Sequence, residues 1–202
     1  GESAMTDYEP FDLSRWCNAN ASILSEDECL PLGRQILRGL PFLFGSEEAD
    51  RRKHCLITLS GTDGSLRIPF GRYMKRVIVA HSLLESNVAE DGFWGKEVAE
   101  YIFNFGDDTQ ERSIVRERFD IGAPPNIEAI SGGTGLFRAV PDQDSTLMPR
   151  YDGEWQQSGR RPMEAERGGV CRYYLWTWRN PYPDRIVQFL DVIPHGPKFI
   201  IG

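Results

Sequence analysis

The chain has 202 residues, of which 40% are hydrophobic and 11% aromatic, enough for a substantial core and too many for a disordered chain. Its net charge is −7, from 23 basic and 30 acidic side chains, which argues against nucleic acid as a partner because nonspecific binding relies on Lys and Arg at phosphates. The longest apolar runs, such as residues 77–80, are too short to span a bilayer, so we expect no membrane partner.

The first five residues, GESAM, resemble a leader added for protein expression. We therefore expect residues 1–7 to be this leader or a disordered segment, and residues 8–202 to form one domain. A single all-β sandwich often reaches this length without dividing. Because a natural signal peptide can be removed before such a leader is added, the compartment stays open.

The chain contains four cysteines, namely Cys17, Cys29, Cys55 and Cys171. No pair has the C-x-x-C spacing, which argues against a zinc ribbon or a thioredoxin-type motif. Cys171 falls in an apolar strand pattern and is expected to be a buried thiol. Cys17 and Cys29 would close a small loop in a secreted protein, and residues 20–22 form an N-glycosylation sequon. We expect an extracellular or periplasmic location, which these features alone do not fix.

In chain order, the first local signal is a weak helical turn over residues 25–28, which Pro31 and Gly33 end promptly. Alternating apolar residues then predict strands over residues 55–60 and 73–81. Because no window carries a clean apolar stripe at helical spacing, we expect no helix longer than about three turns.

The strongest pattern is a β-hairpin formed by residues 98–105 and 111–119. In the first run, Tyr101, Phe103 and Phe105 fall on one face, opposite polar side chains. Glycine, aspartate and threonine between the two runs supply the chemistry of a turn.

Residues 122–169 differ from the rest because glycine and proline are frequent and apolar runs are few. We expect one strand here, over residues 136–140, within a long loop region of the kind that often carries binding sites. Asp142 and Asp144 offer oxygen ligands for a structural calcium ion, but the glycine and distal glutamate of an EF-hand loop are missing, so a plain loop is favoured. No other cofactor is expected.

The C-terminal part alternates again and predicts strands over residues 170–178, 185–193 and 198–201. Two prolines within residues 180–184 remove donors from any β-ladder, so this segment is expected to be a turn at the edge of the sandwich. The predicted fold is all-β: an antiparallel jelly-roll sandwich of two sheets, with at least eight strands and long irregular loops. Ten residues are expected in its core: Phe42, Ile57, Val77, Val79, Tyr101, Phe103, Tyr174, Trp176, Phe189 and Phe199.

Motifs of self-sufficient catalysis are missing from the sequence. There is no G-x-S-x-G elbow, no H-E-x-x-H and no Walker loop, and the glycine-rich residues 132–135 lack the lysine and helix that a phosphate needs. His54, His81 and His195 are isolated, and we interpret them as structural or surface residues. Carboxylates are abundant, but their spacing singles out no pair for glycoside hydrolysis.

Aromatic residues in polar loops are the better indication of function. Trp94 and Trp155 both interrupt glycine-containing polar stretches, where an indole is costly unless it is covered or stacks on a partner. Sugar faces are natural partners, although each indole could instead fold back as a lid on the sandwich. Nearby basic residues suit an acidic ligand or are solvated loop charges. The candidate ligand-binding residues are Trp94, Trp155, Tyr151, Arg150, Arg160 and Arg161.

Five segments, in this order, resemble galactose-binding-like β-sandwich modules that accompany polysaccharide-degrading enzymes. They are residues 30–45 (LPLGRQILRGLPFLFG), 68–71 (IPFG), 101–108 (YIFNFGDD), 120–122 (DIG) and 178–184 (WRNPYPD). The third departs from the family pattern because Gly106-Asp107-Asp108 replaces an Asp-Gly turn. The matched motifs build turns and strand ends and carry no ligand residues. The resemblance implies a jelly-roll module beside a catalytic domain, with a glycan as the expected partner.

Three functions follow from these expectations. The first is a non-catalytic carbohydrate-binding or accessory module whose glycan is neutral or acidic. The second is a structural domain that braces the catalytic domain of a glycoside hydrolase or polysaccharide lyase and has no ligand of its own. The third and weakest is a stand-alone hydrolase.

Overall fold

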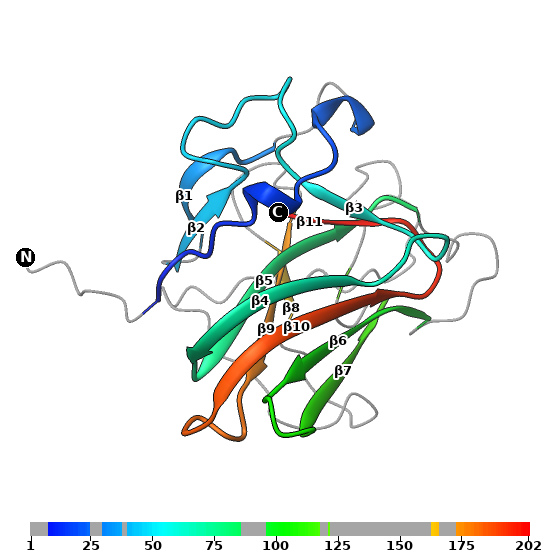
Figure 1. Ribbon diagram of the computed structural model, residues 1–202. Coiled ribbons are helices and arrows are strands. Elements are labelled where there is room, and N and C mark those ends of the chain that lie inside the picture. The colour runs from blue at the N-terminus through cyan, green and yellow to red at the C-terminus, as the bar shows by residue number, and fades with distance from the viewer. Residues whose placement is uncertain are drawn as a thin grey trace, which may run out of the picture.

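Two antiparallel β-sheets pack against each other in the computed structural model and form an open β-sandwich, as the sequence predicts (Figure 1). The structure describes residues 8–24, 30–37, 40–85, 96–117, 121, 163–165 and 173–202, with the backbone alone for 163–165. The predicted helical turn at 25–28 and the predicted strand at 136–140 lie outside these residues.

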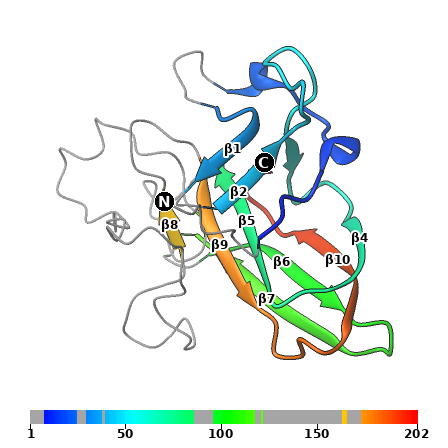
Figure 2. The same ribbon diagram turned by 90° about the vertical axis from the view of Figure 1, so that its left-hand side faces the viewer.

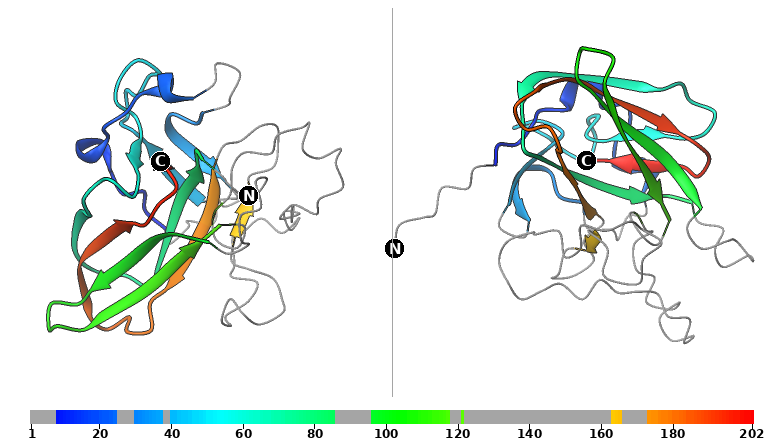
Figure 3. Two further views of the ribbon diagram at one scale, coloured as in Figure 1. Left: turned by 90° about the vertical axis from the view of Figure 1, so that its right-hand side faces the viewer. Right: turned by 90° about the horizontal axis from the view of Figure 1, so that it is seen from below.

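In the described part of the chain, one sheet has four strands in the order β4-β10-β6-β7, and the other has five in the order β3-β11-β5-β9-β8 (Figure 3). The strands of the first sheet are β4 (Leu66–Tyr73), β10 (Ile186–Pro194), β6 (Glu97–Asn104) and β7 (Gln110–Arg116). Those of the second are β3 (Ile57–Leu59), β11 (Phe199–Ile201), β5 (Arg76–Leu83), β9 (Tyr174–Arg179) and β8 (Met163–Ala165). A separate hairpin joins β1 (Gly33–Leu37) to β2 (Leu40–Phe44), and the 3₁₀ turns are Ser14–Trp16 and Ala21–Ile23.

The predicted hairpin is confirmed, because β6 and β7 pair antiparallel around a turn in which Gly106 and Asp108 have positive φ. The predicted proline-rich turn is also confirmed. It joins β9 to β10 and so carries the chain from one sheet to the other. Within the predicted long loop, β8 pairs with β9.

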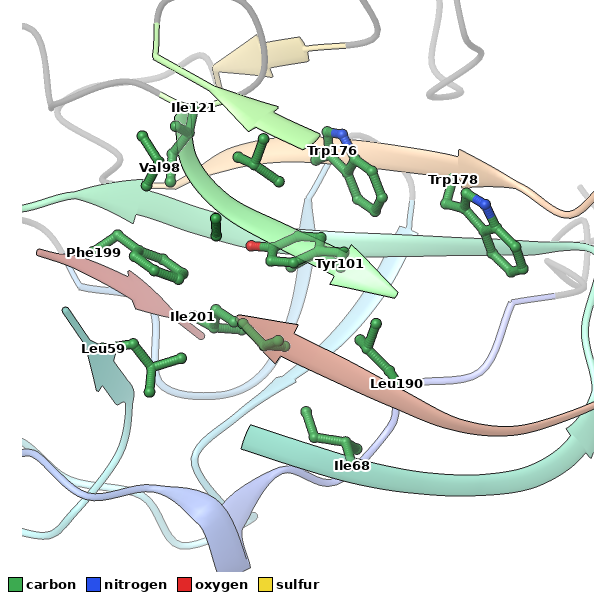
Figure 4. Close-up of a cluster of buried hydrophobic side chains, with 14 of the residues drawn as sticks. Leu59, Ile68, Val98, Tyr101, Ile121, Trp176, Trp178, Leu190, Phe199 and Ile201 are labelled. Atoms are coloured by element: carbon green, nitrogen blue, oxygen red, sulfur yellow. The ribbon is translucent and has the colours of Figure 1, made fainter. Parts of the chain in front are cut away.

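The main hydrophobic core lies between the sheets. Trp176 and Trp178 project from β9 toward Leu190 of β10 and Ile68 of β4 (Figure 4). Tyr101 meets Trp176 edge to face, with ring centroids 5.0 Å apart. Six of the ten predicted core residues are buried: Ile57, Val79, Tyr101, Phe103, Trp176 and Phe199.

The other four predicted core residues are half-buried. Phe42 and Val77 line an open cleft, which leaves part of each side chain exposed. Phe189 lies on the outer face of β10, where the Arg67 guanidinium covers its ring with 3.7 Å between Cζ and the ring centroid. Tyr174 begins β9.

A second core lies on the outer face of the five-stranded sheet, under the hairpin β1–β2 (Figure 2). Phe44 of β2 stacks on Tyr173 with ring centroids 5.1 Å apart. Leu175 and Ile200, from β9 and β11, are fully buried in the same cluster. The five-stranded sheet is therefore covered on both faces, which explains why Tyr173 and Leu175 are buried as well as Trp176 and Trp178.

Candidate functional site

The residues that the sequence predicts as a ligand site all lie outside the described part of the chain. They are Trp94, Trp155, Tyr151, Arg150, Arg160 and Arg161. The possible calcium ligands Asp142 and Asp144, and the cysteines Cys29 and Cys171, also lie outside it. The predicted loop site therefore stays a prediction, and the described residues point to a different place on the fold.

That place is a cleft of about 830 Å³ beside the first half of β5. The ladder between β5 and β11 ends at the pair Ile201–His81, and the Gly202 amide then donates to the Ala80 carbonyl at 2.9 Å. Beyond this point no strand in the described ranges pairs with that side of residues 76–79. β4, which also borders the cleft, is the edge strand of the other sheet.

The cleft extends to both sides of β5, because successive residues of a strand point to opposite faces. Val79 contributes to the lining between the sheets, together with Ile68 and Leu190. Ile78 contributes on the outer face, beneath Phe42 of the hairpin. The deep part of the cleft is thus apolar, and residues of both hydrophobic cores line it.

The N-terminal segment forms one wall of the cleft and is fixed to β4 by aromatic packing. Phe11 meets Phe70 edge to face, with 4.9 Å between ring centroids, and stacks on Trp16 at 6.4 Å. The Arg72 guanidinium lies over Phe11, with 5.6 Å between Cζ and the ring centroid. Contacts between the Phe11 ring and the side chains of Phe70 and Arg72 therefore attach this wall to β4.

The rim of the cleft carries most of its polar groups. It comprises the end of β4, the turn and the first residue of β5, residues 72–76, which read Arg-Tyr-Met-Lys-Arg. Tyr73 is 63% exposed, whereas most aromatic side chains in the described part are buried or half-buried. The exposed Tyr73 ring therefore lies in a segment that also carries three cationic residues.

Asn180 holds the backbone of this rim in place through hydrogen bonds. The Asn180 side-chain amide donates to the Met74 carbonyl at 2.8 Å, and the Asn180 backbone amide donates to the Lys75 carbonyl at 2.9 Å. Its side-chain oxygen accepts from the Tyr182 amide at 2.7 Å. Asn180 is 5% exposed, so these bonds are shielded from water.

Other reactive side chains stand apart from the cleft or are unsuited to chemistry. His81 is fully buried, with its Nδ1 2.7 Å from the Tyr101 hydroxyl, while His54 and His195 are exposed and separate. Burial raises the pKa of the Cys17 thiol to about 11, so it is not activated as a nucleophile. Among the described residues, no group of three His, Cys, Asp or Glu side chains could hold a metal ion.

Comparison with known proteins adds no assignment: no family model, curated protein or solved structure matches the chain. Within the described ranges, no helix is long and apolar enough to cross a membrane. The sequence did contain a sign of the rim, since residues 72–76 place three cations and a tyrosine within five positions of an acidic chain. The spacing alone did not show that this segment borders a cleft.

Proposed function

We propose that this domain is a non-catalytic carbohydrate-binding module and that a glycan binds in the cleft beside β5. The observation that carries the proposal is the exposed Tyr73 ring at the mouth of an apolar cleft of about 830 Å³. Ligand sites are concave and mostly apolar, with a few polar groups that fix orientation. A sugar ring suits this arrangement because its C–H face stacks on an aromatic ring while its hydroxyls reach the rim.

The composition of the cleft supports binding over hydrolysis. Glycoside hydrolysis ordinarily uses two carboxyl groups that flank the scissile bond. Among the described lining residues Glu9 has the only acidic side chain, and it is on the N-terminal wall. Such a module would accompany a catalytic domain of a larger glycan-degrading enzyme, and this partnership is part of the proposal.

The test is a titration of the isolated domain against a panel of oligosaccharides by calorimetry, with Tyr73→Ala as the key variant. Stacking on one ring buries tens of Å², so loss of the ring should weaken binding about 5- to 20-fold. Tyr182→Ala is the matched control, since Tyr182 is 41% exposed, packs its ring on Phe105 and is not itself a lining residue. Its binding should equal that of the wild type.

Two further variants, Trp94→Ala and Trp155→Ala, distinguish the cleft from the loop site predicted from the sequence. If they abolish binding while Tyr73→Ala has no effect, the site lies in the loops and the cleft proposal is wrong. A wild-type domain that binds no glycan would favour the bracing function instead.

A further inference from the structure

The charge of the cleft differs in sign from that of the molecule. The whole chain carries a net charge of −7. The described lining of the cleft holds three cationic side chains, Arg72, Lys75 and Arg76, and one anionic side chain, Glu9. A positive rim on an acidic protein attracts anions locally while the remaining surface repels them.

The cations are presented on defined backbone rather than on a loose loop. Arg72 is the next-to-last residue of β4, and Arg76 begins β5. Lys75 lies between them, and its carbonyl accepts the Asn180 amide at 2.9 Å. Because the backbone is already fixed, binding a ligand here carries no added cost of ordering a loop.

Arg72 has an ion-pair partner, and that pair is weak. The Arg72 Nη1 lies 3.5 Å from a Glu9 carboxylate oxygen, with side chains 50% and 80% exposed. Exposed pairs of this kind contribute little because water screens them. An incoming anion can therefore replace Glu9 at the guanidinium, whose planar fork suits a two-oxygen group.

We propose that the ligand of the cleft is an acidic glycan, with its carboxylate or sulfate groups on Arg72 and Lys75 and a sugar ring on Tyr73. This inference rests on the proposed function and adds the chemical class of the ligand. It places the acid-binding groups on the connection between β4 and β5 rather than on the arginines of the loop region.

The experiment compares two ligands that share one sugar backbone and differ in charge. Oligogalacturonate carries a carboxylate on each ring, and its fully methyl-esterified form carries none. We expect the acid to bind at least about fivefold more tightly than the ester at low salt, and the difference to shrink as salt is added. A sulfated oligosaccharide as a third ligand distinguishes a preference for sulfate from one for carboxylate.

A double variant and a control test whether the cations of the rim bind the acidic groups of the ligand. The double variant Arg72→Gln, Lys75→Gln should weaken binding of the preferred acidic ligand about fivefold or more and reduce its salt dependence. Lys53→Gln removes one exposed cation away from the cleft and should change neither property. Circular dichroism verifies that all variants fold.

The outcomes separate this inference from the proposed function. If the esterified ligand binds as tightly as both acids and Tyr73→Ala still weakens it, the charge assignment is wrong and glycan binding at the cleft stands. If an acid binds better but the double variant binds like the wild type, the rim is not its site. If neither the acids nor any neutral glycan binds, both proposals are wrong.

Discussion

Phe103 shows how single side chains hold the two sheets together. Its ring is fully buried and stacks on Trp178, with 3.7 Å between ring centroids and an interplanar angle of 2°. Phe103 comes from β6 and Trp178 from β9, so this one contact joins the four-stranded sheet to the five-stranded sheet. Because the two rings lie nearly face to face, which the ring quadrupoles do not favour, their contribution comes mainly from the apolar area they bury.

Replacing this ring should be among the most destabilising changes in the protein. We expect Phe103→Ala to lower the free energy of unfolding by about 3–5 kcal/mol, because it removes buried area and leaves a cavity. Phe189→Ala is the matched control and should cost about 1–2 kcal/mol, since Phe189 is half-buried on the outer face. Urea unfolding measures both values. Equal losses for the two variants would contradict this account of the core.

At the scale of elements, the sequence predicted strands whose apolar alternation is uninterrupted. β6 and β7 were found because alternating residues flank a recognisable turn. β4 and the hairpin β1–β2 were missed as strands because Pro69 and Pro41 interrupt their patterns. Proline is compatible with these strands because, among the described residues, β4 is an edge strand with one unpaired side and β2 pairs with β1 alone. Edge position depends on the tertiary fold, which local alternation does not encode.

Two glycines show what positive φ and close packing each contribute to these elements. Gly71 in β4 and Gly45 after β2 have similar φ values of 63° and 74°. A Cβ atom added at Gly71 would meet nothing within 4 Å, whereas one at Gly45 would lie 3.2 Å from the Cα of Cys55 and 3.0 Å from the Cβ of Ala49. The two positions therefore share a backbone penalty and differ in packing.

We expect Gly71→Ala to destabilise the protein by about 1–2 kcal/mol through the backbone penalty alone. Gly45→Ala should lower the free energy of unfolding by at least about 1 kcal/mol more than Gly71→Ala does, because the new methyl group would also crowd the backbone at Cys55. Thermal and urea unfolding of both variants give the comparison. A smaller loss for Gly45→Ala than for Gly71→Ala would show that this region relaxes freely.

At the scale of the whole molecule, the candidate site depends on segments far apart in the chain. The cleft takes its lining from the N-terminal segment, the hairpin, the β4–β5 connection and the C-terminus. Composition identified the aromatic and basic residue types suited to a glycan, but placed them in loops. No local pattern indicates that these four segments, which lie far apart in the sequence, come together around β5. The site could therefore be located only after the sheets were assembled.

The two cores share the five-stranded sheet, and this predicts that the domain unfolds as one unit. β9 contributes Leu175 to the outer core and Trp176 to the inner core. Loss of either core therefore uncovers one face of a strand that the other core also needs. Leu40, on the hairpin, is 3% exposed and lies in the outer core. Leu40→Ala should destabilise the protein by about 2–5 kcal/mol.

The informative measurement for Leu40→Ala, which lies in the outer core, is the unfolding of the inner core. If the domain is cooperative, tryptophan fluorescence, to which Trp176 and Trp178 of the inner core contribute, should shift to lower urea by the same amount as far-ultraviolet circular dichroism. Val115→Ala, which truncates a fully buried side chain of the inner core, should likewise shift both signals together. A fluorescence transition that stays in place while circular dichroism shifts would mean that the hairpin and its core detach independently. In that case the outer wall of the cleft would open without global unfolding, and ligand should then raise the stability of the hairpin alone.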